Sequence, residues 1–275
     1  MLKAFEHWYG PYPFYEDSYK LVEAPYIGME HQSSITYGND YQNGYSGRDR
    51  SDSGWGFKFD FIIVHESGHE WFANNITYKD IADMWIHESF TCYSENLFVE
   101  YYYGKDSGSA YVRGLRKNIR NDKPIIGTYG VNKEGSGDMY DKGANMLHNL
   151  RQIVNDDEKW RAILRGLNSI FYHQTVSSKQ IEDFLSKEVG LDLGPFFDQY
   201  LRDIRIPIFE YQFKHSELSY RWTNCVPGLN MPVKVTLNGK VQWLKPQVGW
   251  TKFSFKHKKL MLRVAKDFYV DVKKI

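Results

Sequence analysis

A chain of 275 residues is long enough for one large domain, or for a main domain with a smaller companion, around a sizeable core. Lys and Arg total 35 against 34 Asp and Glu, so no net field favours nucleic acid or an anionic membrane as a partner. The two cysteines, Cys92 and Cys225, form neither a disulfide framework nor a Cys-rich metal site.

The sequence also contains no apolar run of about 18 residues and no segment with the composition of a signal peptide. We therefore expect a soluble chain without membrane insertion, in a compartment that the sequence does not define.

The first 56 residues are rich in Gly, Pro, Tyr and Asp. Residues 19–23 have the alternation of a strand, and the polar stretch over residues 38–56 predicts a loop, which we expect to be mobile. From Phe57 to about Arg205 the apolar spacing is mostly helical, and about five to seven helices fit this length.

After Pro207 the apolar spacing changes from helical to alternating, which predicts strands. Asn238 and Gly239 separate two alternating runs and supply the two positive φ angles of a type I′ hairpin. The predicted fold class is therefore α+β. We expect a mainly helical domain with a short N-terminal β portion over residues 1–205, and a small antiparallel β domain over residues 206–275.

A candidate metal site lies near the start of the helical region. His65 and His69 are four positions apart in a helical segment, so both imidazoles can reach one ion. Glu66, beside His65, can accept a proton from water on that ion, which makes it a base and not a ligand. In a chain with 9 His this pattern arises by chance about once or twice in a hundred, so a third ligand is needed.

Glu88, on the next predicted helix, completes a set of two His and one Glu. Glu70 and His87 are turned away around their helices from this point. Glu95, two turns beyond Glu88, could accept the free ring N–H of a ligating His, or could be an ordinary carboxylate on the helix surface. Imidazole and carboxylate ligands with an open position favour zinc, at one ion per chain.

These residues resemble the gluzincin family of zinc metallopeptidases that includes aminopeptidase N and leukotriene hydrolase, with the pattern His-Glu-x-x-His, eighteen residues, then Glu. Residues 28–31 resemble its Gly-x-Met-Glu-Asn exopeptidase motif, residues 85–90 its Trp-Leu-Asn-Glu-Gly-Phe block, and residues 140–144 its Tyr-x-Lys-Gly block. The exopeptidase motif departs from the family at Ile27, where Gly is usual, and at His31, where Asn is usual.

The resemblance implies a thermolysin-like catalytic domain followed by a small antiparallel β-sandwich, and a further β domain ahead of this chain. It also implies that Glu30 binds the free α-amine of the substrate, that Gly28 and Met29 belong to the same substrate-binding motif, and that Tyr140 donates to the oxyanion. The alternatives are that Glu30 caps a turn, that Met29 packs in the core, and that Tyr140 only begins a helix.

The activity implied by the resemblance is that of a zinc aminopeptidase acting on peptides with a free N-terminus. One alternative is a zinc hydrolase of another substrate, such as an epoxide. Another is a truncated catalytic core or peptide-binding module that lacks activity alone. A substrate whose amine is acetylated separates the first two, because only an aminopeptidase requires the free amine.

Overall fold

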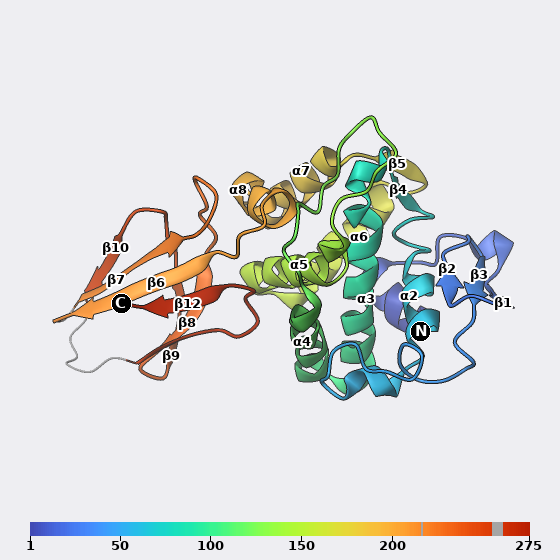
Figure 1. Ribbon diagram of the computed structural model, residues 1–275, viewed down its shortest axis with the longest axis horizontal. Helices are drawn as coiled ribbons and strands as arrows, with labels where there is room; N and C mark the ends of the chain where they lie inside the picture. Colours follow the sequence, from blue (N-terminus) through green and yellow to red (C-terminus); the bar gives the residue numbers. More distant parts are fainter. Residues whose placement is uncertain (216, 255–260) are drawn as a thin grey trace.

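The structure is a computed structural model that describes residues 1–215, 217–254 and 261–275. Figure 1 shows a mainly helical part that holds the N-terminus and a part built of strands that holds the C-terminus. Within the described residues, no helix is both long and apolar enough to span a membrane.

The N-terminal segment packs one helix and a small sheet beside the helical body. Helix α1 (Leu2–Tyr9) is followed by the strands β1 (Lys20–Glu23), β2 (Gly28–Met29) and β3 (Ser34–Tyr37). The strand order is β1-β3-β2, with β1 parallel and β2 antiparallel to β3. The strand predicted over residues 19–23 is therefore present as β1.

The loop predicted over residues 38–56 is held at several points by hydrogen bonds. The Asn39 side-chain amide donates to the Gly44 carbonyl, and Asp49 accepts from the backbone N–H groups of Ser51 and Gly54. The contact between Asp49 and Ser51 is an Asx turn, which satisfies loop backbone locally. The mobility of this loop stays a prediction.

Seven α-helices lie between residues 57 and 205, a range that the structure describes throughout, in agreement with the predicted number. They are α2 (Phe61–Gly68), α3 (Trp85–Tyr103), α4 (Lys105–Gly114), α5 (Asp141–Val154), α6 (Asp157–Ile170), α7 (Ser178–Val189) and α8 (Gly194–Phe197), with the parallel strands β4 (Ile76–Tyr78) and β5 (Gln174–Val176) among them. Asp60 caps α2 by accepting from Ile62 N and Ile63 N. The central helix is α3, which packs against α1, α2, α4 and α5.

Two glycines allow α2 and α5 to lie directly against α3. A Cβ atom on Gly68 would lie 2.5 Å from Ser94 Oγ, and one on Gly143 would lie 1.9 Å from Ser89 Oγ. Neither position therefore has room for a larger residue. This close packing brings the first residues of α3 and α5 to the side of α2 that carries the two histidines of the candidate metal site.

The strands of the C-terminal part form two sheets. One has the order β10-β7-β6-β12 and the other has the order β11-β8-β9. The strands are β6 (Ile208–Lys214), β7 (Glu217–Thr223), β8 (Val233–Leu237), β9 (Lys240–Leu244), β10 (Thr251–Ser254), β11 (Leu262–Val264) and β12 (Asp271–Lys274). Asn238 and Gly239 join β8 to β9 with φ values of 49° and 80°, as the predicted hairpin requires.

One strand departs from the antiparallel prediction, because β12 runs parallel to β6. Before β12 the chain returns to the helical part, where Arg116 donates hydrogen bonds to the carbonyls of Lys266 and Asp267. It therefore enters the sheet at the end where β6 begins, and Asp271 N donates to Pro207 O.

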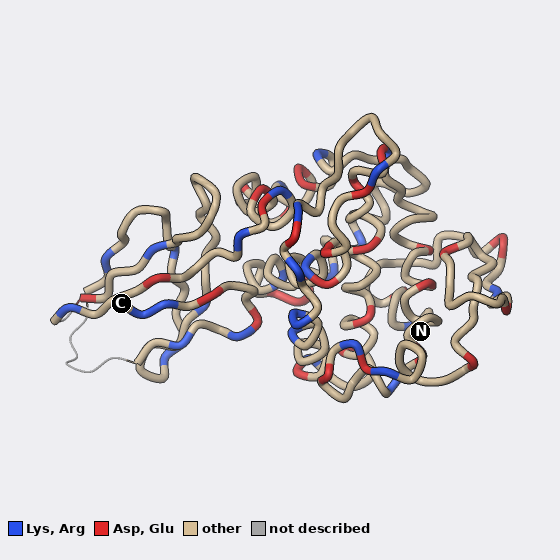
Figure 2. Tube along the Cα trace, viewed as in Figure 1, with Lys and Arg blue, Asp and Glu red and all other residues tan. Residues whose placement is uncertain are grey.

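The near-neutral total charge is the sum of two unequal parts. Residues 206–275 contain 13 of the 35 Lys and Arg residues but only 4 of the 34 Asp and Glu residues. Figure 2, a Cα trace coloured by residue type, shows most of the acidic residues in the helical part. The two parts thus carry net charges of opposite sign, which the overall balance conceals.

Candidate active site

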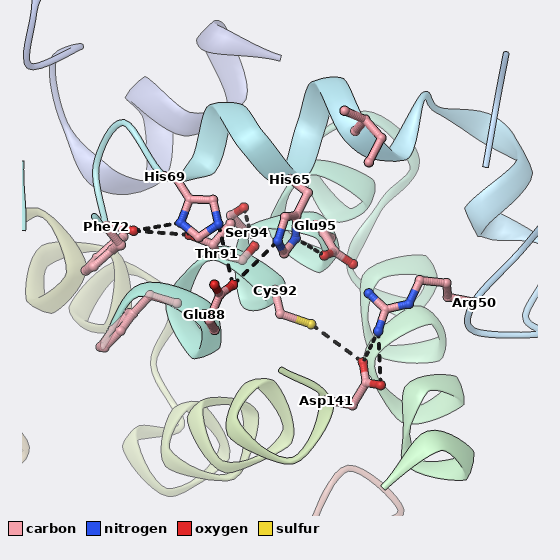
Figure 3. A network of polar contacts seen from close by, with 12 residues as sticks. Arg50, His65, His69, Phe72, Glu88, Thr91, Cys92, Ser94, Glu95 and Asp141 are labelled. Atoms are coloured by element: carbon pink, nitrogen blue, oxygen red, sulfur yellow. Dashed lines mark hydrogen bonds and ion pairs between the residues drawn. The ribbon is translucent and has the colours of Figure 1, made fainter. Parts of the chain in front are cut away.

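The three predicted metal ligands converge. The Nε2 atoms of His65 and His69 lie 3.6 Å and 3.5 Å from Glu88 Oε2, and all three side chains are buried (Figure 3). Zn–N and Zn–O bonds of about 2.1 Å separate two ligands of a tetrahedral ion by about 3.4 Å. The spacing therefore matches zinc ligands, and is longer than a charge-assisted hydrogen bond.

The charges of this cluster also favour a cation. Among the described residues Glu88 Oε2 is buried and has no hydrogen-bond partner. Burial alone would lower the pKa of His65, but Glu88 and Glu95 raise it to about 10. Burial alone would raise the pKa of Glu88, but His69 and His65 hold it well below its usual range. Both shifts mean that positive charge between these side chains is stabilised, so the donor set fits Zn²⁺.

Both imidazoles are oriented through their other nitrogen. His65 Nδ1 lies 2.7 Å from Glu95 Oε1, and His69 Nδ1 lies 3.0 Å from the Phe72 carbonyl. An Nδ1–H that donates to these acceptors leaves Nε2 free to bind a metal. Glu95 is fully buried and also accepts from Tyr111 at 2.6 Å, so it is not an ordinary carboxylate on the helix surface.

The two residues that the helix geometry excluded as ligands have other partners. Glu70 accepts a hydrogen bond from Ser33 N at 2.7 Å, and His87 Nε2 accepts one from Tyr78 N at 3.2 Å. Their side chains therefore hold the neighbouring loops and strands.

Glu66 faces the strand β2 from α2. A Cβ atom on Gly28 would lie 2.7 Å from Glu66 Oε1, so the strand can pass this close only because residue 28 is glycine. Burial raises the pKa of the Glu66 carboxyl, although His65 and His69 oppose the shift. A carboxylate with a raised pKa is a better proton acceptor, which suits a general base.

The Glu30 carboxylate lies beside the proposed metal site. One carboxylate oxygen of Glu30, one of Glu66 and a ring nitrogen of His69 all lie within 4.8 Å of one another. In the described part of the chain the Glu30 carboxylate accepts no hydrogen bond, so turn capping does not describe it. Its backbone carbonyl accepts from the Asn74 side chain at 3.1 Å, which fixes the segment to the turn after α2.

The neighbours of Glu30 differ in how firmly they are held. Met29 is 43% exposed, so the alternative in which it packs in the core is wrong. His31, at the position where the resembled motif has Asn, places Nδ1 2.9 Å from Thr36 Oγ1.

Tyr140 occupies the N-cap position of α5, without a capping hydrogen bond from its side chain, and its ring faces His65 of the proposed metal site. Its ring centroid lies 6.1 Å from that of His65, and the two planes differ by 29°. Burial raises the pKa of the Tyr140 hydroxyl, and the negative charge of Glu88 raises it further. The hydroxyl therefore keeps its proton and can donate it in a hydrogen bond.

Several residues of this region carry no signal in the sequence. Arg50 contacts Asp141, Tyr111 holds Glu95, and Asn74 holds the segment of Glu30. Each contact joins residues from different elements, so periodicity does not predict it. Of Arg50, Asp141, Tyr111 and Asn74, only Asp141 lies within a motif block of the sequence, directly after Tyr140.

Lys142 and Arg151, two basic residues of α5, are both buried. Lys142 Nζ donates to the Asp203 carbonyl at 2.9 Å, and burial lowers its pKa to about 8. Arg151 forms hydrogen bonds with Glu100 at 2.6 Å and 2.7 Å. These two residues therefore hold α5 to its neighbours.

The chain is similar to a known protein family and to several known proteins. The profile described as the Peptidase family M1 domain matches residues 1–200. The aminopeptidase N of Lactococcus lactis subsp. lactis is 27% identical over 165 residues, which is 54% of this chain and 19% of that protein. A probable aminopeptidase 1 of Saccharolobus solfataricus is 21% identical over 246 residues, 83% of this chain and 31% of that protein. The chain thus spans less than a third of the length of these curated relatives.

The fold is similar to that of solved structures. The M1 zinc metallopeptidase from Deinococcus radiodurans superposes with a TM-score of 0.59 at 23% identity, over 75% of this chain and 43% of that one. A mutant of the Deinococcus radiodurans enzyme bound to a Tyr-Ser-Ala substrate gives a TM-score of 0.58 at 22% identity, over 74% and 43% of the two chains. At this identity the likeness concerns the fold.

Proposed function

Since the chain belongs to peptidase family M1, we propose that it is a zinc-dependent aminopeptidase that hydrolyses the N-terminal peptide bond of peptides. The family assignment agrees with the resemblance inferred from the motifs. The observation that carries the proposal is the position of Glu30, whose carboxylate lies within 4.8 Å of both the Glu66 carboxylate and a ring nitrogen of His69.

The proposed metal site consists of His65, His69 and Glu88, and their spacing supports a tetrahedral ion with one open position. When bound, Zn²⁺ supplies Lewis-acid polarisation of the substrate carbonyl and lowers the pKa of water from about 15.7 to about 7. Glu95 would hold His65 in the tautomer that leaves Nε2 available.

The remaining roles belong to side chains around this site. Glu66 would accept a proton from the attacking water and return it to the leaving amine, and its raised pKa supports that role. Tyr140 would donate to the oxygen of the tetrahedral transition state, where negative charge develops. Its pKa, raised by burial, supports a hydroxyl that stays protonated.

Exopeptidase character would come from Glu30. A carboxylate that binds the substrate ammonium fixes the distance between the N-terminus and the metal, so only the first peptide bond meets the base. Gly28 would bring β2 close enough for its backbone to contact the substrate, while Met29 would contact the substrate from its exposed position.

We also propose the finer division of the chain into a thermolysin-like catalytic domain over residues 1–205 and a small β-sandwich domain over residues 206–275. In support of this boundary, the last turn of the helical part ends at Arg202 and the first strand of the β part begins at Ile208. A further β domain ahead of the chain stays a prediction.

The test combines metal analysis with peptidase assays on the zinc-loaded chain. We expect about one zinc per chain, hydrolysis of aminoacyl fluorogenic substrates, loss of hydrolysis on chelation, and recovery when zinc is returned. The double variant His65→Ala, His69→Ala is the control and should hold no zinc. A zinc content near zero in the unmutated chain would contradict the proposed site.

A further inference from the structure

Arg50 lies outside every motif of the site but is close to two of its helices. It belongs to the loop over residues 38–56, and its side chain is only 25% exposed. Its Nη2 atom donates to both carboxylate oxygens of Asp141, at 3.3 Å and 3.2 Å (Figure 3). The guanidinium also lies over the ring of Phe61, 5.0 Å from its centroid.

These two contacts lie at the starts of the helices that bear the catalytic groups. Asp141 is the first residue of α5 and follows Tyr140 directly. Phe61 is the first residue of α2, and its ring stacks on that of His65 at 5.1 Å with 15° between the planes. Arg50 therefore contacts both helices beside the site itself.

The carboxylate of Asp141 is well placed to transmit this contact. It is 8% exposed and lies in the first turn of α5, where a negative charge is favourable. Cys92 Sγ, from α3, lies 3.7 Å from its Oδ1. A shift of Asp141 would move the adjoining peptide unit, and with it Tyr140.

The backbone that carries Arg50 is itself anchored. Its carbonyl accepts from the Asn118 side chain at 3.2 Å, and the neighbouring Asp49 is held by hydrogen bonds from Ser51 and Gly54. The guanidinium thus extends from a fixed point. Arg48, two residues earlier in the same loop, is exposed and provides a matched comparison.

We propose that Arg50 is a positioning residue, which holds Asp141 and thereby keeps the Tyr140 hydroxyl where it can donate to the substrate during the reaction. This inference rests on the proposed function for the role of Tyr140. The planar guanidinium is suited to the task because it can stack on Phe61 and pair with a carboxylate at once, which a lysine ammonium does less well.

A double-mutant cycle between Arg50→Met and Tyr140→Phe tests whether the two residues act together. In the zinc-loaded chain, Arg50→Met should lower kcat by about tenfold or more with KM changed less than about twofold, because the lost contact serves only the transition state. In the Tyr140→Phe background the same change should cost less than about twofold, since coupled residues are not additive. Arg50→Lys should fall between Arg50→Met and the unmutated chain.

Arg48→Met is the matched control and should leave both constants unchanged. Equal losses from Arg50→Met in the two backgrounds would overturn the proposal, as would an Arg50→Met variant as active as Arg48→Met. If Arg50→Met does not fold, as judged by thermal unfolding, Arg50→Lys replaces it in the cycle with the same criterion.

A second readout does not depend on activity. The Ala144 N–H donates to the Tyr140 carbonyl at 2.9 Å and so reports the first turn of α5. Its hydrogen exchange should quicken by about tenfold in Arg50→Met and stay unchanged in Arg48→Met. Unchanged exchange in Arg50→Met would overturn the link even in an active enzyme. If the unmutated chain is inactive but the Ala144 N–H still exchanges faster in Arg50→Met, the proposed function is refuted while the contact between Arg50 and the first turn of α5 is supported.

Discussion

The two ends of the proposed site are built in different ways. The metal end consists of the proposed ligands His65, His69 and Glu88, which lie at α2 and α3. All three are buried, and each imidazole has a hydrogen-bond partner for its Nδ1 atom. The amine end consists of Glu30 and the two-residue strand β2 before it. Met29 of this strand is 43% exposed, and the Glu30 carbonyl accepts a hydrogen bond from Asn74, in the turn after α2.

This difference suggests that the two ends have different functions. A metal site needs its donors within a few tenths of an ångström of fixed positions, and packed helices with buried hydrogen bonds provide that precision. Recognition of the substrate's N-terminal residue needs accessible side chains, and these can be substituted without loss of the metal when they lie outside the metal site. Changes at the metal end should therefore abolish chemistry or metal binding, whereas changes at the amine end should alter selectivity.

The largest effect is expected at Glu66. Glu66→Gln preserves the shape of the side chain but removes the base, so kcat should fall by about 10² to 10⁴-fold while about one zinc stays bound. Parallel metal analysis and steady-state kinetics check both parts. An emptied metal site would show that Glu66 is a ligand, and full activity would remove it from the mechanism.

The next largest effect is expected on the zinc affinity of the metal end. Glu95→Gln weakens the acceptor for His65 Nδ1–H, so zinc affinity should fall by about 10 to 100-fold in a chelator competition assay. The exposed Glu134 provides a matched control, and Glu134→Gln should leave the affinity unchanged. Equal affinities in the two variants would mean that Glu95 does not orient the ligand.

At the amine end, Glu30→Ala should reduce kcat/KM for substrates with a free amine by about 10 to 100-fold, the value of one charge-assisted contact. Zinc affinity should not change, because Glu30 is not among the three proposed ligands. Glu23→Ala, on the exposed strand β1 of the same sheet, is the control. A loss of zinc in Glu30→Ala would erase the distinction between the two ends.

The smallest effect is expected where the two ends meet. A methyl group on Gly28 would lie 2.7 Å from Glu66 Oε1 and 2.8 Å from Ile62 Cγ2, so Gly28→Ala should displace the strand or the base. We expect kcat/KM to fall about tenfold, with zinc retained. Unaltered kinetics would show that the strand can move away from Glu66 without consequence.

The sequence predicted the metal end better than the amine end for a physical reason. The spacing of His65, Glu66 and His69 along one helix is a local property, so periodicity alone was enough to propose their convergence. The contacts of Glu30 with α2 and of Arg50 with Asp141 join distant segments, and neither periodicity nor composition predicts such contacts. The motif resemblance, not geometry, singled out Glu30 and Tyr140.

The same limit explains the one pairing in the β part that differs from expectation. The parallel pairing of β12 with β6 depends on the return of the chain to Arg116, a tertiary contact that alternation does not encode. The opposite charges of the two parts were hidden because the overall balance sums over both. The hairpin at Asn238 and Gly239 was predicted because it depends on local backbone conformation only.

The central claim, that a metal site and an amine site together make an aminopeptidase, is tested most directly with one pair of peptides. The zinc-loaded chain is incubated with a peptide and with its N-acetylated form, and the products are identified by mass spectrometry. We predict stepwise release of N-terminal residues from the free peptide and no cleavage of the acetylated one. Equal cleavage of both peptides, or cleavage at internal bonds, would contradict the claim.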